Sequence, residues 1–320
     1  MVKKIKKKKI IFFLPTFALG GASDSIFILS KFLVKKNFSV LLLSIGKNHY
    51  KGKFINLGCE VIEINSKRSL FSIFKYRKII KNEIKKKYSQ TILISNIHYA
   101  NIISLIACYK IKGLKIILTE RSSLSELSIF KSFITSAKNK LILLLAVYLY
   151  RFSDLIITNS IYEKNYIKEN FKAKKIKCIH PPSIKNISRK YKKIYNLKKK
   201  KIIYVGRLSK EKGVDIIIDA LSIVSKKYKF LFEIYGKGKD KKILQNLVKH
   251  HKMEKKVLFK GFLYNKNKIF KNADLFINAS KFEGLPNALV QSLNYGIFPI
   301  CTNSPGGNME VIKFGKLGLS

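Results

Sequence analysis

The chain lacks tryptophan and has little cysteine, with only four cysteines in 320 residues. These cysteines are far apart in the sequence and form neither a CxxC pair nor a Cys/His ligand cluster. Such usage argues against a disulfide framework and is typical of reduced thiols in a cytoplasmic protein. A run of 18 or more apolar residues is also missing, so no membrane-spanning helix is predicted. The four cysteines are Cys59, Cys108, Cys178 and Cys301.

Acidic residues are scarce as well. There are 18 of them against 65 lysines and arginines, which gives a formal net charge of +47. Alone, this charge would suggest a polyanionic partner, such as nucleic acid or an anionic membrane surface. The lysines are spread over nearly every predicted helix and linker, and no helix-turn-helix, zinc-finger or RNP-like signature accompanies them. We therefore favour a mostly solvated charge, disfavour nucleic acid, and keep open a patch that holds the protein at a membrane.

Short apolar runs alternate with helical patterns along the chain, and this alternation predicts parallel α/β sheets. A chain of this length, with 47% hydrophobic residues, can bury two cores. We predict two Rossmann-like doubly wound domains, at 1–182 and 201–320, joined by a basic linker at 183–200. The predicted strands are Ile10–Leu14, Val40–Ile45, Val61–Ile64, Thr91–Ser95, Lys115–Thr119, Leu155–Thr158 and Ile176–His180, then Ile202–Val205, Phe230–Tyr235, Val257–Phe259, Leu275–Asn278 and Pro299–Thr302.

The N-terminal segment has two interpretations. MVKKIKKKK followed by IIFFLPTFALGGAS is similar to a signal peptide, with a basic start, an apolar stretch and small residues. However, Pro15 interrupts the apolar run, and the next strand follows at βαβ spacing. We favour a buried strand at Ile10–Leu14 and a helix from about Ser23 to Lys36.

Polar residues and glycines gather between Glu283 and Glu310, after the apolar strand that ends in Ala279 and Ser280. Ligands of open α/β sheets collect beyond the carboxyl ends of strands, where helix N-termini offer unpaired N–H groups. Glu283 lies on such a loop, Pro286 suits the first turn of a helix, and Gln291 lies about two turns further on. The next strand leads into the turn SPGGN, so two strand ends are predicted to meet at one site.

A second motif, KIIYVGRLSKEKG, opens the second domain. Arg207 follows the strand and Gly206 directly, and Lys212 lies at the start of the next helix. A forked guanidinium and an ammonium at this place can stabilise the charge that develops on a leaving phosphate group.

Together these motifs resemble the "glycosyl transferases group 1" family of retaining, nucleotide-sugar-dependent glycosyltransferases of the GT-B fold. That family shows Glu, seven residues, Glu, and then a Gly-Gly-x-x-Glu turn, which is Gly306, Gly307 and Glu310 here. The second acidic position is Gln291 in this chain. The resemblance covers Ile10 to Ile312, and family members continue for a few helices beyond the place where this chain ends.

The resemblance implies a hexosyltransferase-type enzyme with two domains facing each other across a cleft and no metal or other cofactor. No Asp-x-Asp pair is present either. The donor would be a UDP- or GDP-sugar, and the acceptor a cell-surface glycan or a polyprenyl-linked molecule at the inner face of the membrane. The implied catalytic residues are Arg207, Lys212, Glu283 and His98. The implied donor and substrate contacts are Gly20, Gly21, Arg121, Gly206, Gly236, Gly261, Phe262, Gly284, Leu285, Asn287, Gln291, Gly306, Gly307 and Glu310.

Three of these residue groups lie in the first domain, and each has a plain structural alternative. Gly20 and Gly21 resemble the family's glycine-rich loop but also suit an ordinary turn. His98 lies near a histidine that touches the donor sugar in relatives, but it also suits a half-buried helix start. Arg121 resembles a residue that faces acceptor phosphate, and a solvated loop arginine is the alternative.

The segment Leu127–Phe152 contains ten apolar residues in a row. We favour a core helix, while its basic residues leave open a helix that rests on lipid. Two other functions remain as alternatives to the enzyme. One is a polyanion-binding module, supported by charge alone. The other is a catalytically impaired relative that keeps only sugar-nucleotide binding, as Gln291 and the early end of the chain would suggest.

Overall fold

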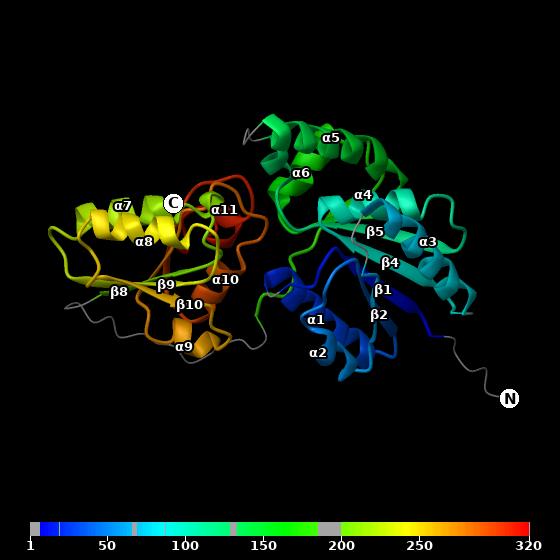
Figure 1. Cartoon of the computed structure of the whole chain (residues 1–320), viewed down its shortest axis with the longest axis horizontal. Helices are drawn as coiled ribbons and strands as arrows, with labels where there is room; N and C mark the ends of the chain where they lie inside the picture. Colours follow the sequence, from blue (N-terminus) through cyan, green and yellow to red (C-terminus); the bar gives the residue numbers. More distant parts are fainter. Residues whose placement is uncertain are drawn as a thin grey trace. The chain divides into compact units, whose positions relative to one another are not determined.

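The computed structural model describes residues 7–18, 20–65, 69–86, 88–128, 133–184 and 200–319. The chain forms two compact units, Met1–Ser183 and Ile184–Ser320. Most of the predicted linker, residues 185–199, lies outside the described residues. Each unit is a fully parallel sheet with helices on both faces, which confirms the predicted fold class (Figure 1). Within the described residues, no helix combines the length and apolarity needed to cross a bilayer.

The first unit has a seven-stranded sheet in the order β3-β2-β1-β4-β5-β6-β7. Its elements are β1 (Lys9–Leu14), α1 (Gly21–Lys35), β2 (Ser39–Ser44), α2 (Lys51–Ile55), β3 (Glu60–Glu63), α3 (Ser69–Lys85), β4 (Thr91–Asn96), α4 (His98–Ala107), β5 (Leu114–Glu120), the 3-10 helices η1 (Leu124–Ser128) and η2 (Tyr150–Phe152), α5 (Phe133–Leu149), β6 (Leu155–Thr158), α6 (Ile161–Asn170) and β7 (Ile176–Cys178).

The second unit has a five-stranded sheet in the order β10-β9-β8-β11-β12. Its elements are β8 (Lys200–Val205), the 3-10 helix η3 (Lys210–Lys212), α7 (Val214–Val224), β9 (Phe230–Tyr235), α8 (Lys241–His250), β10 (Val257–Gly261), α9 (Lys266–Phe270), β11 (Leu275–Asn278), α10 (Asn287–Asn294), β12 (Phe298–Cys301) and α11 (Asn308–Val311).

Successive residues of the central strands enter different cores, as the two-residue period of a strand requires. In β1, Ile11 and Phe13 join the core under α3 to α5, whereas Ile10 and Phe12 join the core under α1 and α2. The second unit repeats this arrangement around β8. Burial on both faces explains why these strands read as continuous apolar runs in the sequence. The predicted strand at Ile10–Leu14 is confirmed.

Candidate functional site

The strand order of the second sheet reverses between β8 and β11, which are hydrogen-bonded neighbours. In open α/β sheets, ligands bind beyond the carboxyl ends of the strands at such a switch point. Arg207 follows β8 and Glu283 follows β11, so the topology places the two predicted motifs on either side of this point. The turn after β12 is adjacent because β12 pairs with β11.

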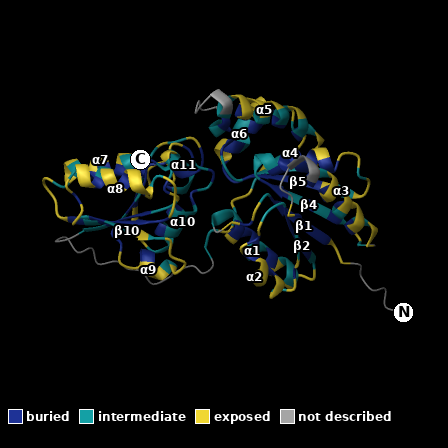
Figure 2. Cartoon of the chain, in the orientation of Figure 1, coloured by how far each residue is buried: buried dark blue, intermediate teal, exposed yellow. Residues whose placement is uncertain are grey.

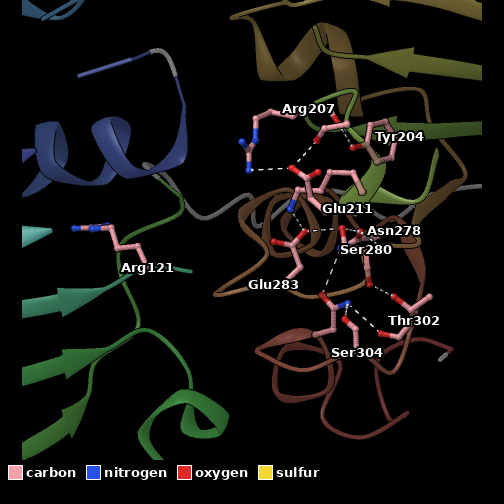
Figure 3. Close-up of polar contacts among 12 residues, drawn as sticks. Arg121, Tyr204, Arg207, Glu211, Asn278, Ser280, Glu283, Thr302 and Ser304 are labelled. Carbon is pink, nitrogen blue, oxygen red and sulfur yellow. Dashed lines mark hydrogen bonds and ion pairs between the residues drawn. The ribbon is translucent and has the colours of Figure 1, made fainter. Parts of the chain in front are cut away.

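Lys212 and Glu283 form the central charged pair of this site. The Lys212 Nζ donates to Glu283 Oε1 at 2.7 Å, although the two residues are 71 positions apart in the chain. Their side chains are 15% and 16% exposed, so the pair is largely withdrawn from water but open on one side. In Figure 3 the Glu283 carboxylate extends from its loop toward Ser280. The site therefore presents a cation and an anion side by side.

Ser280 connects Glu283 to the end of β11. Its Oγ lies 2.8 Å from Glu283 Oε1 and 2.6 Å from Asn278 Oδ1, and the side chain is fully buried. Asn278 contacts Asn308 in turn, and the Asn308 Nδ2 donates to the Thr302 carbonyl at 3.0 Å. This chain of hydrogen bonds holds the loops after β11 and β12 together (Figure 3). Sequence reasoning did not assign Ser280, Asn278 or Asn308, although the small polar residues that end the strand were the signal.

The Gly-Gly turn packs backbone to backbone against the loop of Glu283. The Glu283 N–H donates to the Pro305 carbonyl at 3.0 Å, and the Gly307 N–H donates to the Gly284 carbonyl at 2.8 Å. A Cβ on Gly306 would lie 1.6 Å from the Glu283 carbonyl oxygen, and its φ of +120° is one that side chains rarely adopt. Glycine is therefore required at position 306 by this close approach.

Arg207 lies at the rim of the site, with its side chain 75% exposed. The Tyr204 hydroxyl donates to its carbonyl at 2.7 Å, and its guanidinium is 3.7 Å from Glu211. Burial alone would raise the pKa of Glu211, but a hydrogen bond from Ser209 and the nearby cationic charges lower it overall. The backbone of Arg207 is thus fixed, while its charge remains available to a ligand.

The loops after β8, β9 and β10 are linked in series. Gly206 N–H donates to the Tyr235 carbonyl at 3.0 Å, and Gly236 N–H donates to the Gly261 carbonyl at 2.9 Å. A Cβ on Gly236 would lie 1.8 Å from the Gly206 carbonyl oxygen. Phe262 follows β10 and is 36% exposed. The predicted glycines of this edge thus let three loops pack closely, and an aromatic ring stands beside them.

The remaining predicted residues of the second unit lie on or near α10 and α11. Asn287 begins α10, and Gln291 follows it by about one turn on a half-buried surface. Leu289 on the opposite side is fully buried and anchors the helix. Leu285 precedes α10, and Glu310 lies in the short helix α11.

In the first unit, His98 is the first residue of α4, directly after β4. Burial lowers the pKa of its imidazole to about 4, so the ring is neutral at pH 7. Its Nδ1 is buried and has no hydrogen-bond partner among the described residues. Gly20 and Gly21 lie at the start of α1, after β1. Since β1 and β4 are the switch-point pair of this sheet, the topology brings these residues to one edge.

Arg121 follows β5 and joins three segments of the first unit. Its Nε donates to Asn96 Oδ1 at 2.8 Å and its Nη1 to Ser25 Oγ at 2.6 Å. Burial lowers the pKa of its guanidinium to about 10, so it remains charged at pH 7. Arg121 is thus bound within its own unit, and its predicted role toward an acceptor stays a prediction.

Comparison with known protein families decides the assignment. The model of glycosyltransferase family 4 matches residues 19–182, about half of the chain, and the model described as glycosyl transferases group 1 matches residues 185–320. The chain belongs to these glycosyltransferases. The family suggested by the sequence motifs is confirmed.

Three relatives illustrate the similarity. An N-acetylgalactosamine-N,N'-diacetylbacillosaminyl-diphospho-undecaprenol 4-alpha-N-acetylgalactosaminyltransferase of Campylobacter jejuni is 33% identical over 53% of this chain and 47% of that protein. The amylovoran biosynthesis glycosyltransferase AmsD of Erwinia amylovora is 22% identical over 95% of this chain and 84% of its own length. The crystal structure of Anabaena HepE with UDP and glucose has a TM-score of 0.73, with 20% identity over 94% of this chain and 82% of that one.

The likeness to HepE shows the GT-B fold. The matched part of the chain spans about half the length of the first curated relatives.

Proposed function

We propose that this glycosyltransferase moves a sugar from a nucleotide-sugar donor to a hydroxyl group of a glycan or of a lipid-linked acceptor. The observation that carries the proposal is the pairing of Lys212 with Glu283 at the switch point of the second sheet, with Arg207 at its rim. Two cations can bind a diphosphate, and a carboxylate can bind sugar hydroxyl groups. A nucleotide-sugar carries both chemical groups.

The donor would exchange the internal ion pair for contacts with itself. In the described structure the Lys212 ammonium is balanced by Glu283 at 2.7 Å, which keeps two largely buried charges paired. A bound diphosphate would form ion pairs with the Lys212 ammonium and with the Arg207 guanidinium. The Glu283 carboxylate, still held by Ser280 Oγ at 2.8 Å, would accept hydrogen bonds from the sugar.

The proposed step is a transfer at the anomeric carbon. The bond between this carbon and the phosphate oxygen breaks, and its electron pair leaves with the nucleoside diphosphate. The acceptor oxygen forms the new glycosidic bond, and its proton passes to the leaving phosphate oxygen. We propose a front-face attack, which retains the anomeric configuration. Lys212 and Arg207 would stabilise the leaving charge, a role that needs no metal ion.

The printed names of relatives support the substrate classes. HepE was crystallised with UDP and glucose, the Campylobacter enzyme is named for an undecaprenol diphosphate acceptor, and AmsD is named for amylovoran biosynthesis. We propose by analogy a UDP-sugar as donor, ahead of a GDP-sugar, and polysaccharide or lipopolysaccharide assembly as the process. Lipid-linked acceptors would place the protein at the inner face of the cell membrane.

A second candidate function is sugar-nucleotide binding without efficient transfer. The observation that favours it is Gln291, which occupies the second acidic position of the family motif. In this case donor binding would be retained and turnover would be absent.

The test combines binding and turnover. A thermal-shift screen against UDP- and GDP-sugars should raise the melting temperature with one donor, because a ligand at 100 times its Kd stabilises by about 2.7 kcal/mol. Glu283→Gln should weaken binding of the sugar-nucleotide and leave binding of the free nucleotide nearly unchanged. Equal losses for both ligands would mean that Glu283 supports the fold instead. Release of nucleoside diphosphate in the presence of acceptor then separates the enzyme from the binding protein.

A further inference from the structure

The helix α5 of the first unit has an apolar surface that faces solvent. Leu141, Leu144 and Tyr148 recur at helical spacing on one side and are 59%, 68% and 55% exposed, and Phe152 in η2 is 45% exposed. The opposite side is anchored in the core by Ala146 of α5 and by Tyr150 at the start of η2, which are both fully buried. We call the four exposed residues the α5 face. Figure 2 shows exposed residues along α5. The predicted core helix is thus apolar on both sides.

Basic side chains border the α5 face. Lys138 and Lys140 are exposed on the same helix, and the sequence from Phe133 to Phe152 contains no acidic residue. The guanidinium of Arg151 stacks on the Tyr148 ring, with its carbon 4.1 Å from the ring centroid, and lies 4.9 Å from that of Phe152. Within the described residues, none of these three cations forms an ion pair with a carboxylate.

A groove of about 690 Å³ runs beside the α5 face toward the end of α6. Leu143 and Val147 line its apolar part, while Lys140, Arg151 and Lys172 contribute positive charge. Together, the groove and the α5 face form an apolar surface that is bordered by positively charged side chains. A contiguous exposed apolar patch of this kind marks an interaction surface.

We propose that the α5 face docks on an anionic phospholipid surface. Leucine and aromatic side chains would enter the boundary between headgroups and acyl chains, as on an interfacial helix, and the lysines and Arg151 would contact lipid phosphates. Long basic side chains and tyrosine suit this boundary because their stems and rings are apolar and their tips are polar. A second copy of this chain is a poorer occupant, since each copy carries a formal net charge of +47 and the copies repel.

This inference deepens the proposed function, because it names the surface by which the enzyme would reach a lipid-linked acceptor. Vesicle binding is measured without donor or acceptor, so its result is independent of whether sugar transfer occurs. Failure of one proposal therefore does not imply failure of the other.

The experiment is vesicle flotation of the full chain, with phosphatidylcholine vesicles that contain or lack about one third phosphatidylglycerol. Binding is expected to the anionic vesicles and to weaken at high salt, where charges are screened within about 3 Å at 1 M. Leu144→Ser combined with Tyr148→Ser should weaken binding roughly tenfold or more. The matched control is Ile223→Ser with Tyr228→Ser in the second unit, where the side chains are 69% and 67% exposed. This control should bind as the parent does.

The charge contribution has its own pair of variants. Lys138→Gln with Lys140→Gln should weaken binding by roughly fivefold for each lysine, corresponding to about 1 kcal/mol per charge. Lys226→Gln with Lys227→Gln removes the same charge from an exposed stretch of the second unit and should change binding little. If the control pairs weaken binding as much as the α5 pairs, the attraction is a background of the whole chain and the proposal is wrong.

The absence of tryptophan from the chain gives a readout that leaves the face nearly intact. Tyr148→Trp introduces a single fluorophore, whose emission should shift to the blue and be quenched by brominated lipid. Tyr228→Trp should show neither effect. No vesicle binding by the parent, or an unquenched Tyr148→Trp, overturns the proposal. So does a dimer in light scattering that Leu144→Ser disrupts, or an acidic protein that occupies the α5 face while vesicles do not.

Discussion

The two units use the carboxyl edge of their sheets differently. In the second unit, Lys212 and Glu283 meet on loops that are held by glycine contacts, and Arg207 extends into solvent at 75% exposure. In the first unit, the corresponding edge is closed by hydrogen bonds within the unit, as Arg121 joins Asn96 to Ser25. The charged side chains at the carboxyl edge of the second sheet lie where a ligand could contact them. Charges at the first edge hold the strands and helices together.

Two buried glutamates, Glu120 and Glu163, also serve to hold the first unit together. Glu120, at the end of β5, accepts hydrogen bonds from Tyr150 and from Asn101. Glu163, at the start of α6, accepts from Ser123 Oγ and from the Leu124 N–H, both at 3.0 Å. Both glutamates are 1% exposed. Acidic residues are rare in this chain, and these two serve the interior of the first unit.

The largest effect is expected from Gly306→Ala, which should displace the loop that carries Glu283 in the second unit. A Cβ 1.6 Å from the Glu283 carbonyl oxygen cannot be accommodated without moving that loop. We expect donor binding to fall below detection in calorimetry, with a lower melting temperature. The control is Gly315→Ala, where φ is +95° but no atom lies within 4 Å. It should show only local strain of about 1 kcal/mol and retain binding. Equal effects would mean that backbone strain, and not the contact with Glu283, matters.

The next largest effect is expected from removing either cation of the site, and the two variants should differ in stability. Lys212→Ala and Arg207→Ala should each reduce turnover by roughly 100-fold or more, because each removes a charge partner of the leaving group. Only Lys212→Ala should also lower the melting temperature, since it leaves the 16% exposed Glu283 uncompensated. Lys210→Ala, an exposed neighbour, is the control and should be neutral. Normal turnover in both site variants would refute the assignment.

The fold could be predicted closely because its signals are local. Each of the twelve strands in the described residues lies within two residues of the predicted range, since apolar runs buried on both faces are visible in the sequence. Arg207, Lys212 and Glu283 were predicted as site residues because their motifs follow strands, and their catalytic roles stay predictions. The contact between Lys212 and Glu283 was not predicted, because it depends on how loops 71 residues apart pack.

Side-chain networks within the units escaped prediction for the same reason. Nothing in the sequence around Ser280 shows that its hydroxyl contacts Asn278, nor that Asn278 reaches Asn308, 30 positions away. For α5, the sequence favoured a core helix and left open a helix that rests on lipid. Ten consecutive apolar residues carry no information on which of them the neighbouring helices cover. Whether Leu144 is in the core or in solvent depends on tertiary packing.

In the first unit, Arg121→Ala is expected to have a smaller effect than the variants of the second unit. If this arginine mainly joins Asn96 and Ser25, its loss should cost about 1.5 to 3 kcal/mol of unfolding free energy, as for hydrogen bonds to charged groups. Arg121→Lys should recover little, because an ammonium cannot replace a planar fork. Thermal shifts by the sugar-nucleotide should persist in both variants. Loss of turnover with an unchanged melting temperature would instead support the predicted contact with the acceptor.

The pH dependence of stability tests the role of the two buried glutamates. Burial, together with the nearby charge of Glu163, raises the pKa of Glu120 to about 8 despite its hydrogen bond from Tyr150. An unfolded glutamate titrates near 4.3, so the unfolded chain releases this proton first as the pH rises. Stability should therefore fall between about pH 4.3 and pH 8. Glu120→Gln should flatten that slope in thermal melts, whereas Glu169→Gln on the exposed side of α6 should not. An unchanged slope in Glu120→Gln would contradict the assignment.

The smallest effect is expected at Gln291, the departure within the family motif. We propose that this side chain contacts the ribose of the donor, because it stands at the second glutamate position of the family motif that the sequence resembles. A carboxylate can accept hydrogen bonds from both hydroxyl groups of a vicinal diol, whereas an amide offers one acceptor oxygen. Hydrogen bonds to charged groups contribute about 1.5 to 3 kcal/mol, against about 0.5 to 1.5 kcal/mol for neutral ones. Gln291→Glu should therefore tighten donor binding by about 1 kcal/mol, which is several-fold in Kd.

The matched ligand for this prediction is the 2′-deoxy analogue of the donor. It lacks one hydroxyl group of the diol, so the added carboxylate has one partner fewer and the gain from Gln291→Glu should be much smaller. Titration calorimetry with both ligands measures the difference directly. Gln245→Glu, at an exposed position of α8, makes the same substitution outside the proposed site and controls for a general effect of lowering the net charge. The same gain for both ligands, or a loss for both, would show that Gln291 does not face the ribose. The donor would then lie differently on α10, while the contact between Lys212 and Glu283 would remain.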